Sequence, residues 1–499
     1  MREIKKKVYS GFSYLILTRL LTYGFSTIKF LILARYIEPY HFGVIGSCTL
    51  FFSISNILIL PSFDFYLIQK NDDRIDKYFA TTFWSGIFRG LLLFFIIRFL
   101  SNYISNFFND RNIFYAINYL SFIFLINSLV SPKSVYMTKY FEFNKKFYIS
   151  FMVSLFDFIL SIYLLKFVKD YRLLIYSSIF SSIINNLIWY YYYPYLPEFK
   201  FSFLRFREII SFSKWINFSN ILAYLLQNFD DWMVAKFLGV NKLAIYQLGY
   251  RISNQPLNNF IGIINEVLFP LYSKIKNNKN ELYNVYLKAI TIFGAIGFFW
   301  VLILFSYSDY FINLLLNKNW SSVSLIIKFL SVYVLFKIYT WSNGIIFISL
   351  GKPSINTFLM FIEVILMIPL VIYLTIKYQL TGTCIAVTLP VILISIFNYF
   401  KIKDCLEIKE DKIFMRISFL IFLNFIFYIL NFFILKLFVW YVSIFVIVNL
   451  YMLTLYFIDK RLRFGFIYNL KEFLYSIRSK YEKVQLHSCY LRICRKRDD

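Results

Sequence analysis

The sequence predicts an all-α polytopic membrane protein with about 14 transmembrane helices, forming two six-helix lobes and two extra C-terminal helices. Three observations support this fold class. The 499 residues are 59% hydrophobic and only 16% charged, with a mean hydropathy of +0.62. Long apolar runs recur along the whole chain, and a short sequence pattern is repeated in its two halves.

The composition excludes several classes of protein. Soluble chains average about 25% charged residues, and a soluble fold of this composition would expose apolar patches that aggregate. An ordinary cytosolic enzyme, a disordered chain and a secreted disulfide scaffold are therefore excluded. The five cysteines are scattered without a CxxC pair, and there are two histidines. We expect neither a metal site nor a cofactor.

The apolar runs define the candidate spans, each of which needs about 20 apolar residues. They are 8–34, 41–66, 78–102, 112–137, 147–167, 171–194, 209–237, 242–273, 281–308, 320–349, 354–377, 380–400, 413–437 and 439–459. Pro61 and Asp64 interrupt the second run, which makes it one of the weakest. Because the runs are continuous rather than alternating, a β-barrel is excluded.

Charge predicts the orientation of these spans. The chain has a net charge of +26, with 53 Lys and Arg against 27 Asp and Glu. If residue 1 is inside, most basic residues fall on inner loops and termini, as in other membrane proteins. Arg2, Lys5, Lys6 and Lys7 precede a first run without a cleavage site, which indicates a retained span. Both termini are therefore expected in the cytoplasm.

The loops leave little room for an enzyme or for nucleic-acid binding. The longest outer loops are near 103–111 and 309–319, and the inner loops near 195–208 and 401–412 are interpreted as connectors. The sequence has no P-loop, GxSxG, HExxH or zinc cysteine cluster, so we expect no enzyme activity. The basic residues are spread along short loops, which argues against a nucleic-acid partner.

An internal repeat predicts the two lobes. Residues 34–45 read ARYIEPYHFGVI, and residues 235–246 read AKFLGVNKLAIY. The copies join spans one and two and spans seven and eight, so both face the same way, as in parallel-repeat transporters. The expected parts are an N-terminal lobe at 1–200, a C-terminal lobe at 201–405, extra spans at 406–460 and a basic cytoplasmic tail at 461–499.

Charged residues inside the spans suggest a ligand, since each costs about 2.5–3.5 kcal/mol at mid-bilayer. The deep cations are Arg19, Arg89, Arg251 and Lys337, and the deep acids are Asp157 and Glu363. The excess of cations indicates an anionic ligand, and a guanidinium suits phosphate. Simple ion pairs, Arg89 with Asp157 and Lys337 with Glu363, stay open. Lys29 lies near a span end, where it is expected to reach the headgroups.

Two helices carry polar faces. Asn217, Asn220, Tyr224 and Asp231 share one face of span seven, and Arg251, Asn254, Asn258 and Asn265 share one face of span eight. Such faces line a water-filled cavity or pair with another helix. For the amides, interhelical hydrogen bonds are an equally good explanation.

Several stretches resemble the polysaccharide flippases of the multidrug/oligosaccharidyl-lipid/polysaccharide (MOP) exporter superfamily. They are LARYIEPYHFGVIG at 33–46, LIQKNDDRIDKYFATTFW at 67–84, DDWMVAKFLGVNKLAIYQLGYRISNQP at 230–256, VLFPLYSKI at 267–275 and SLGKPSINTFLMF at 349–361. The matching positions are Asp230, Lys236, Gly239, Tyr246, Tyr250, Arg251, Pro256 and Pro270. The sequence departs from the family pattern at LPSFDFY, residues 60–66, where the family usually has a glycine.

The resemblance implies a Wzx-like flippase of the bacterial inner membrane, with a MATE-like pseudo-twofold arrangement of its lobes. Such proteins move undecaprenyl-diphosphate-linked oligosaccharide for O-antigen, capsule or exopolysaccharide assembly. Membrane lipids, a polysaccharide polymerase and a chain-length regulator are the implied partners. A cation-coupled drug or small-molecule exporter of the same superfamily and a membrane glycan polymerase are the alternatives.

The flippase interpretation assigns roles to the polar residues as hypotheses. The diphosphate would contact Arg19, Arg89, Arg251 and Lys337. The sugars would meet Asn217, Asn220, Tyr224, Asn254 and Asn258. Membrane potential or a counterflow of protons or sodium would drive transport, and the candidates for the coupling ion are Asp157, Asp231 and Glu363.

Overall fold

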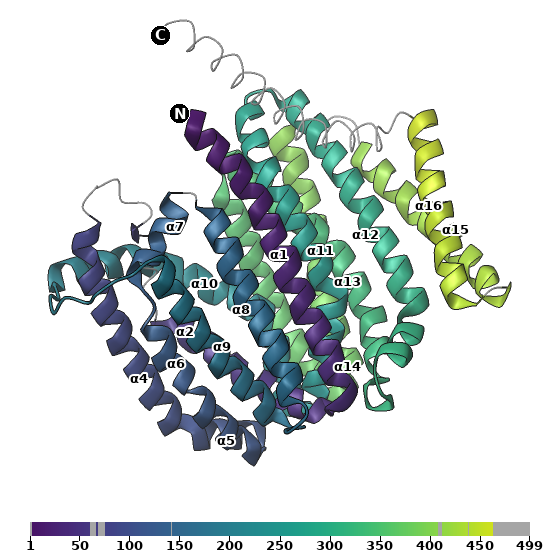
Figure 1. Cartoon of the computed structure of the whole chain (residues 1–499). Helices are drawn as coiled ribbons and strands as arrows, with labels where there is room; N and C mark the ends of the chain where they lie inside the picture. Colours follow the sequence, from purple (N-terminus) through teal and green to yellow (C-terminus); the bar gives the residue numbers. More distant parts are fainter. Residues whose placement is uncertain are drawn as a thin grey trace, which may run out of the picture. The chain divides into compact units, whose positions relative to one another are not determined.

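A computed structural model describes residues 2–59, 66–67, 75–140, 142–407, 412–437 and 439–462. All regular elements in these ranges are helices (Figure 1), so the predicted all-α class is confirmed. Residues 60–65, which hold most of the departure from the family pattern, and almost all of the predicted tail lie outside the described residues.

The first part of the chain forms helices joined by short turns. They are α1 (Arg2–Tyr36), α2 (Pro39–Ile59), α4 (Asp76–Phe108), α5 (Arg111–Leu120), α6 (Phe122–Ser128), the 3₁₀ turn η1 (Pro132–Ser134), α7 (Val135–Lys139), α8 (Phe143–Leu164) and α9 (Tyr171–Tyr192). The carboxylates of Asp110 and Asp170 cap the first turns of α5 and α9 by accepting backbone N–H bonds. The predicted span 112–137 is broken into α5, α6, η1 and α7, with a bend of 69° between Ser128 and Pro132.

The second part contains the longest helices. They are α10 (Phe203–Leu238), α11 (Val240–Ile275), α12 (Lys279–Leu315), the 3₁₀ turn η2 (Lys318–Trp320), α13 (Val323–Ser349), α14 (Pro353–Leu406), α15 (Lys412–Leu437) and α16 (Trp440–Leu462). Within α14, Gln379 has φ 54° and ψ −138°. This residue divides α14 at the boundary between the predicted spans 354–377 and 380–400.

Eight helices in the described residues are long and apolar enough to cross a membrane, and the bent α5–α7 segment would make nine. The described residues of each predicted span lie mainly in helices, and polar residues lower the hydropathy of α10 and α11. The chain is thus a multi-span membrane protein. The number fourteen stays a prediction.

The chain forms two compact units. The first comprises 1–252, 311–329 and 360–390, and the second comprises 253–310, 330–359 and 391–499. The predicted lobe boundaries at 200 and 405 stay predictions.

In the first unit, small side chains allow close helix packing. A Cβ on Gly90 of α4 would lie 2.5 Å from the Cβ of Ser128 and 2.8 Å from the carbonyl oxygen of Phe124, both on α6. Helix α1 packs along α8, and α8 packs on α9. Close approach through small residues is typical of helix packing in lipid, where apolar burial gives no driving force.

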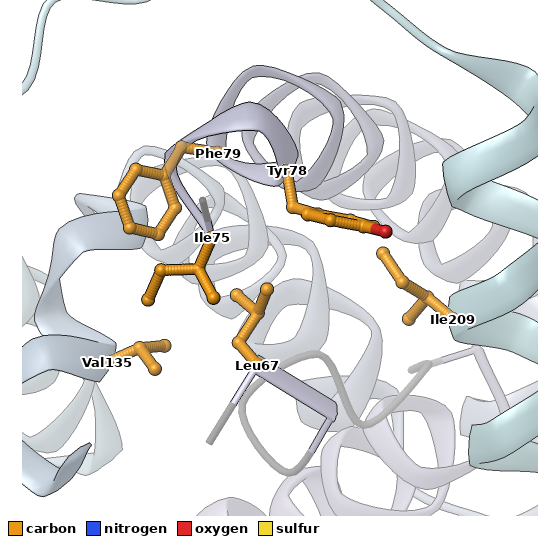
Figure 2. Close-up of a cluster of buried hydrophobic side chains, with 6 residues drawn as sticks. All are labelled: Leu67, Ile75, Tyr78, Phe79, Val135 and Ile209. Carbon is orange, nitrogen blue, oxygen red and sulfur yellow. The ribbon is translucent and has the colours of Figure 1, made fainter. Parts of the chain in front are cut away.

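A buried apolar cluster lies at one end of the first unit. Figure 2 shows its six side chains, which come from the start of α4, from α7, from α10 and from the segment before α4: Leu67, Ile75, Tyr78, Phe79, Val135 and Ile209. The hydroxyl of Tyr78 leaves the cluster and donates to Glu208 Oε2 at 2.9 Å. The cluster therefore fixes the ends of three helices to one another.

The second unit contains the additional helices α15 and α16. The buried Tyr307 hydroxyl of α12 donates to Asn431 Oδ1 of α15 at 2.5 Å and lies 3.1 Å from Ser443 Oγ of α16. Tyr451 of α16 donates to the carbonyl oxygen of Ala295 at 3.1 Å. Buried hydrogen bonds thus attach both helices to α12.

Candidate functional site

The motif around Gly239 forms a tight corner between α10 and α11. Gly239 is the one residue between the helices and has φ 85°, which a side chain would disfavour. Across this corner, Tyr246 Oη donates to Asp230 Oδ2 at 2.6 Å and Gln247 Nε2 donates to Asp231 Oδ2 at 2.9 Å. Both acids of the motif are therefore held by donors from the next helix.

The two copies of the internal repeat touch each other. A Cβ on Gly43 of α2 would lie 1.8 Å from the carbonyl oxygen of Val240 of α11. A Cβ on Gly46 would lie 2.4 Å from Gln247 Oε1. Glycine is required at Gly43 because a backbone atom occupies the space of any side chain. The repeated segments thus form the contact between α2 and α11.

An aromatic group supports the first copy. Phe30, Phe42 and Trp320 lie with ring centroids 4.6 to 5.9 Å apart. The indole N–H of Trp320 donates to the carbonyl oxygen of Ala34 at 2.9 Å, and Trp320 is fully buried. This contact fixes the C-terminal end of α1 where the repeat begins.

Arg251 reaches from α11 to the middle of α1. Its Nη2 donates to Ser26 Oγ at 2.6 Å, and its guanidinium carbon lies 5.2 Å from the centroid of the Phe30 ring. Its buried Nε has no hydrogen-bond partner among the described residues. Tyr23 of α1 is a second hydrogen-bond partner of the guanidinium, so Nε is the donor that these two contacts leave unsatisfied.

The face of α1 that Arg251 contacts also carries Arg19. Arg19, Tyr23, Ser26 and Phe30 follow steps of four, three and four residues and share one face of the helix. Arg19 is exposed and lies about 10 Å along the helix from Ser26, at ~1.5 Å per residue. Two of the predicted phosphate-binding cations are thus associated with the same face of α1.

Lys29 forms an ion pair that the sequence did not predict. Its Nζ lies 2.5 Å from Asp157 Oδ2 on α8, with side chains 18% and 25% exposed. Ser181 of α9 donates to Asp157 Oδ1 at 3.1 Å. The expectation that Lys29 reaches the headgroups is wrong, and Asp157 pairs with Lys29 rather than with Arg89. Residues far apart in the sequence meet here, so no local pattern could reveal the pair.

The other two predicted cations lie elsewhere. Arg89 is half-buried on α4, beside Gly90. Lys337 belongs to the second unit, is 8% exposed and lies with its Nζ 5.8 Å from the Tyr333 ring centroid. Glu363, its open partner from the sequence, is 5% exposed and belongs to the first unit. Their pairing stays a prediction.

The predicted sugar-contacting residues occupy different environments. Tyr224 is buried, donates to the carbonyl oxygen of Leu50 and accepts from the Trp232 indole, each at 2.8 Å. Asn220 is exposed, and the side chain of Asn217 lies outside the described residues. In the second unit, Asn258 is half-buried, and Asn254 is 1% exposed with neither amide atom bonded to a described residue.

Comparison with known proteins identifies the family. A family model described as a polysaccharide biosynthesis protein matches residues 32–325, which is more than half of the chain. The chain belongs to this polysaccharide biosynthesis protein family. The match includes both copies of the repeat, the Gly239 corner and Arg251. The resemblance stated from the sequence motifs is therefore confirmed.

Two bacterial relatives extend along most of the chain. The lipopolysaccharide biosynthesis protein WzxC of Escherichia coli (strain K12) is 24% identical over 399 residues, covering 79% of this chain and 80% of WzxC. The teichuronic acid biosynthesis protein TuaB of Bacillus subtilis (strain 168) is 23% identical over 349 residues, covering 69% of this chain and 71% of TuaB.

Solved structures show the same fold. The lipid II flippase MurJ, in an inward closed conformation, superposes with a TM-score of 0.70 at 14% identity, covering 91% of this chain and 99% of MurJ. An inward-facing MATE-family multidrug transporter of the MOP superfamily gives a TM-score of 0.60, covering 79% of this chain and 99% of the transporter. The predicted fold class is thus that of MurJ and MATE proteins.

Proposed function

We propose that the chain is a flippase that moves undecaprenyl-diphosphate-linked oligosaccharide across the bacterial inner membrane. The observation that carries this proposal is the position of Arg251, a family-motif arginine whose Nε has no partner among the described residues and whose guanidinium lies beside Tyr23 and Ser26 of α1. Family membership and relatives named for lipopolysaccharide and teichuronic acid biosynthesis support a lipid-linked glycan as cargo.

The diphosphate would bind first to Arg19 and then to Arg251, along the same face of α1. A guanidinium offers several N–H donors in a planar fork that matches phosphate oxygens. Arg19 is exposed, whereas Arg251 is largely covered. The diphosphate would therefore meet the accessible cation first, while the apolar carrier chain stays in lipid. Arg89 and Lys337 remain proposed contacts for other stages of transport.

The acids supply candidates for ion coupling. Asp157, the ion-pair partner of Lys29, is one proposed site for the coupling ion on α8. Asp231 and Glu363 remain proposed sites for a proton or a sodium ion. Transport that depends on a proton gradient and is lost in Asp157→Asn would support the first of these three.

The function is tested with purified protein in liposomes that contain a fluorescent lipid-linked oligosaccharide diphosphate. We expect exchange of the label between leaflets with wild-type protein and a loss of at least about tenfold with Arg251→Gln, the worth of one charge-assisted contact. The matched control is Arg98→Gln, because Arg98 is an exposed arginine on α4 that contacts the rings of Phe94 and Phe122. Equal transport in all three proteins would contradict the proposed role of Arg251.

The same liposomes distinguish the alternative functions. A cation-coupled exporter would move cationic dyes and leave the lipid-linked label in its original leaflet. A glycan polymerase would lengthen the oligosaccharide instead of moving it. Either result without lipid exchange would overturn the flippase proposal.

A further inference from the structure

A basic pocket lies at one end of the first unit, away from Arg251. It has a volume of about 900 Å³ and is lined by residues from α4, η1, α7, α9, the α9–α10 loop and α10. The cations of its lining are Lys77, Lys133, Lys200 and Arg205, and its acids are Asp76 and Glu198. The lining therefore carries a positive excess, which favours an anion.

The pocket is a built feature of the fold. The α9–α10 loop is held over α4, because the Trp84 indole donates to the carbonyl oxygen of Glu198 at 2.8 Å. Arg205 donates to the carbonyl oxygen of Lys77, and Lys133 Nζ lies 5.8 Å from the centroid of the Tyr195 ring. The acids are already engaged, Glu198 with Lys200 at 2.9 Å and Asp76 with the Tyr136 hydroxyl. Lys77 and Lys133 belong to the lining and are not the partners of these two acids.

The segment that covers the pocket carries exposed apolar side chains, which we call its apolar rim. Leu196 belongs to the lining and is 89% exposed, while Phe199 and Leu204 are next in sequence to the lining residues Lys200 and Arg205 and are 88% and 74% exposed. The Phe199 ring also packs on Trp84, with centroids 4.8 Å apart. Apolar side chains beside cations are the pattern of segments that lie in the headgroup region of a membrane. A free phosphate compound would need the cations alone and would leave this apolar rim in water.

The pocket lies at the end of the first unit that is expected to face the cytoplasm. In Figure 1, α7 and the N-terminus lie toward the upper end of the first unit, and α5 lies at its lower end. The N-terminus is predicted to be cytoplasmic from the distribution of charge. Anionic lipid in the cytoplasmic leaflet is attracted by basic pockets between helices on this side.

We propose that this pocket binds the phosphate headgroup of an anionic phospholipid of the cytoplasmic leaflet. Lys133, Arg205 and their neighbours contact the phosphate, and Leu196, Phe199 and Leu204 lie among the acyl chains. The lipid then fastens the α9–α10 loop, which joins the two predicted lobes, to the membrane surface. This inference is independent of the cargo that the protein transports.

Native mass spectrometry of the purified full-length protein tests the proposal, with phosphatidylglycerol and phosphatidylcholine of identical acyl chains as probes. Wild type is expected to retain phosphatidylglycerol in preference. The double variant K133Q/R205Q should bind it about thirtyfold more weakly, at ~1 kcal/mol per cation. The matched control R207Q/K401Q removes two exposed cations outside the pocket and should stay within about threefold of wild type. Equal losses in both doubles would show diffuse attraction and overturn the pocket.

Three further experiments test a soluble phosphate as ligand, the role of the apolar rim and the effect of misfolding. Glycerol 1-phosphate at millimolar concentration should leave the bound lipid in place, and displacement would assign the pocket to a soluble phosphate. Phe199→Ser should weaken phosphatidylglycerol binding without removing a charge, and unchanged binding would overturn the role of the rim. If the K133Q/R205Q protein melts earlier in phosphatidylcholine, Lys200→Gln replaces it, because Lys200 is 79% exposed and its loss cannot empty a core.

Discussion

At the scale of single residues, the chemistry of the guanidinium at position 251 is open to a direct test. Arg251→Lys keeps the charge but loses the planar fork, so lipid transport in liposomes is expected to fall about tenfold. Ser26→Ala should have a smaller effect, because Ser26 orients Arg251 through one hydrogen bond. Full activity in Arg251→Lys would mean that a point charge suffices and that phosphate is not held by two donors.

The Lys29–Asp157 pair makes a second prediction. Lys29→Met leaves the Asp157 carboxylate in the membrane with only Ser181 as donor, and the amount of folded protein in detergent should fall markedly. Lys29→Met combined with Asp157→Leu removes both charges and should recover most of the folded protein. Fluorescence-detected size exclusion measures both. If the double variant gives no more folded protein than Lys29→Met alone, the ion pair contributes to folding by more than the mutual neutralisation of its two charges.

Some of these side-chain contacts can be inferred from the sequence, and others cannot. Asp230 and Tyr246 are connected across a corner whose glycine is visible in the sequence, so their proximity could be inferred from helix-hairpin geometry. Lys29 and Asp157 lie 128 residues apart, and only the packing of α1 on α8 brings them together. The Tyr224 hydroxyl likewise bonds a backbone oxygen of α2, and a backbone acceptor leaves no trace in the residue pattern.

At the scale of helices, the crossing of α2 and α11 depends on Gly43. Gly43→Ala places a methyl group where the carbonyl oxygen of Val240 lies, so the helices must separate. We expect a lower melting temperature and less protein in the membrane. Gly24→Ala is the control, since a Cβ at Gly24 of α1 meets nothing within 4 Å. Equal stability of the two variants would contradict direct contact between the repeat copies.

Helix positions were predicted well because twenty apolar residues in lipid have few alternatives to a helix. Breaks were harder to predict. The span expected at 112–137 is divided into short helices, with Pro132 at the bend, whereas the division of α14 occurs at Gln379 and not at Pro369 within the same helix. A proline marks a possible bend, but packing decides whether the chain turns there.

At the scale of the whole molecule, the sequence is sufficient to predict the fold class from composition and to show the repeat directly, whereas the sidedness that charge predicts stays a prediction. Contacts that tertiary packing creates between distant segments cannot be predicted from the sequence in this way. The basic pocket illustrates the difference: residues 195–208 were interpreted as a connector, yet in the fold this segment meets α4 and α7 and completes a site with Lys133. Its residues come from three predicted spans and the two loops before 78 and after 194, and no local pattern connects them.

The orientation of the chain is the last prediction, and α4 is the element that tests it. Its 33 residues extend for about 50 Å, more than the ~30 Å of the bilayer core, so its ends must emerge on opposite sides. The pocket lies at its start, and Asn106 is exposed near its end. With the native cysteines replaced, Asn106→Cys should react with an impermeant maleimide in spheroplasts, and Glu198→Cys only after lysis. The reverse pattern would place the basic pocket at the outer leaflet and contradict both the predicted topology and the lipid proposed to occupy it.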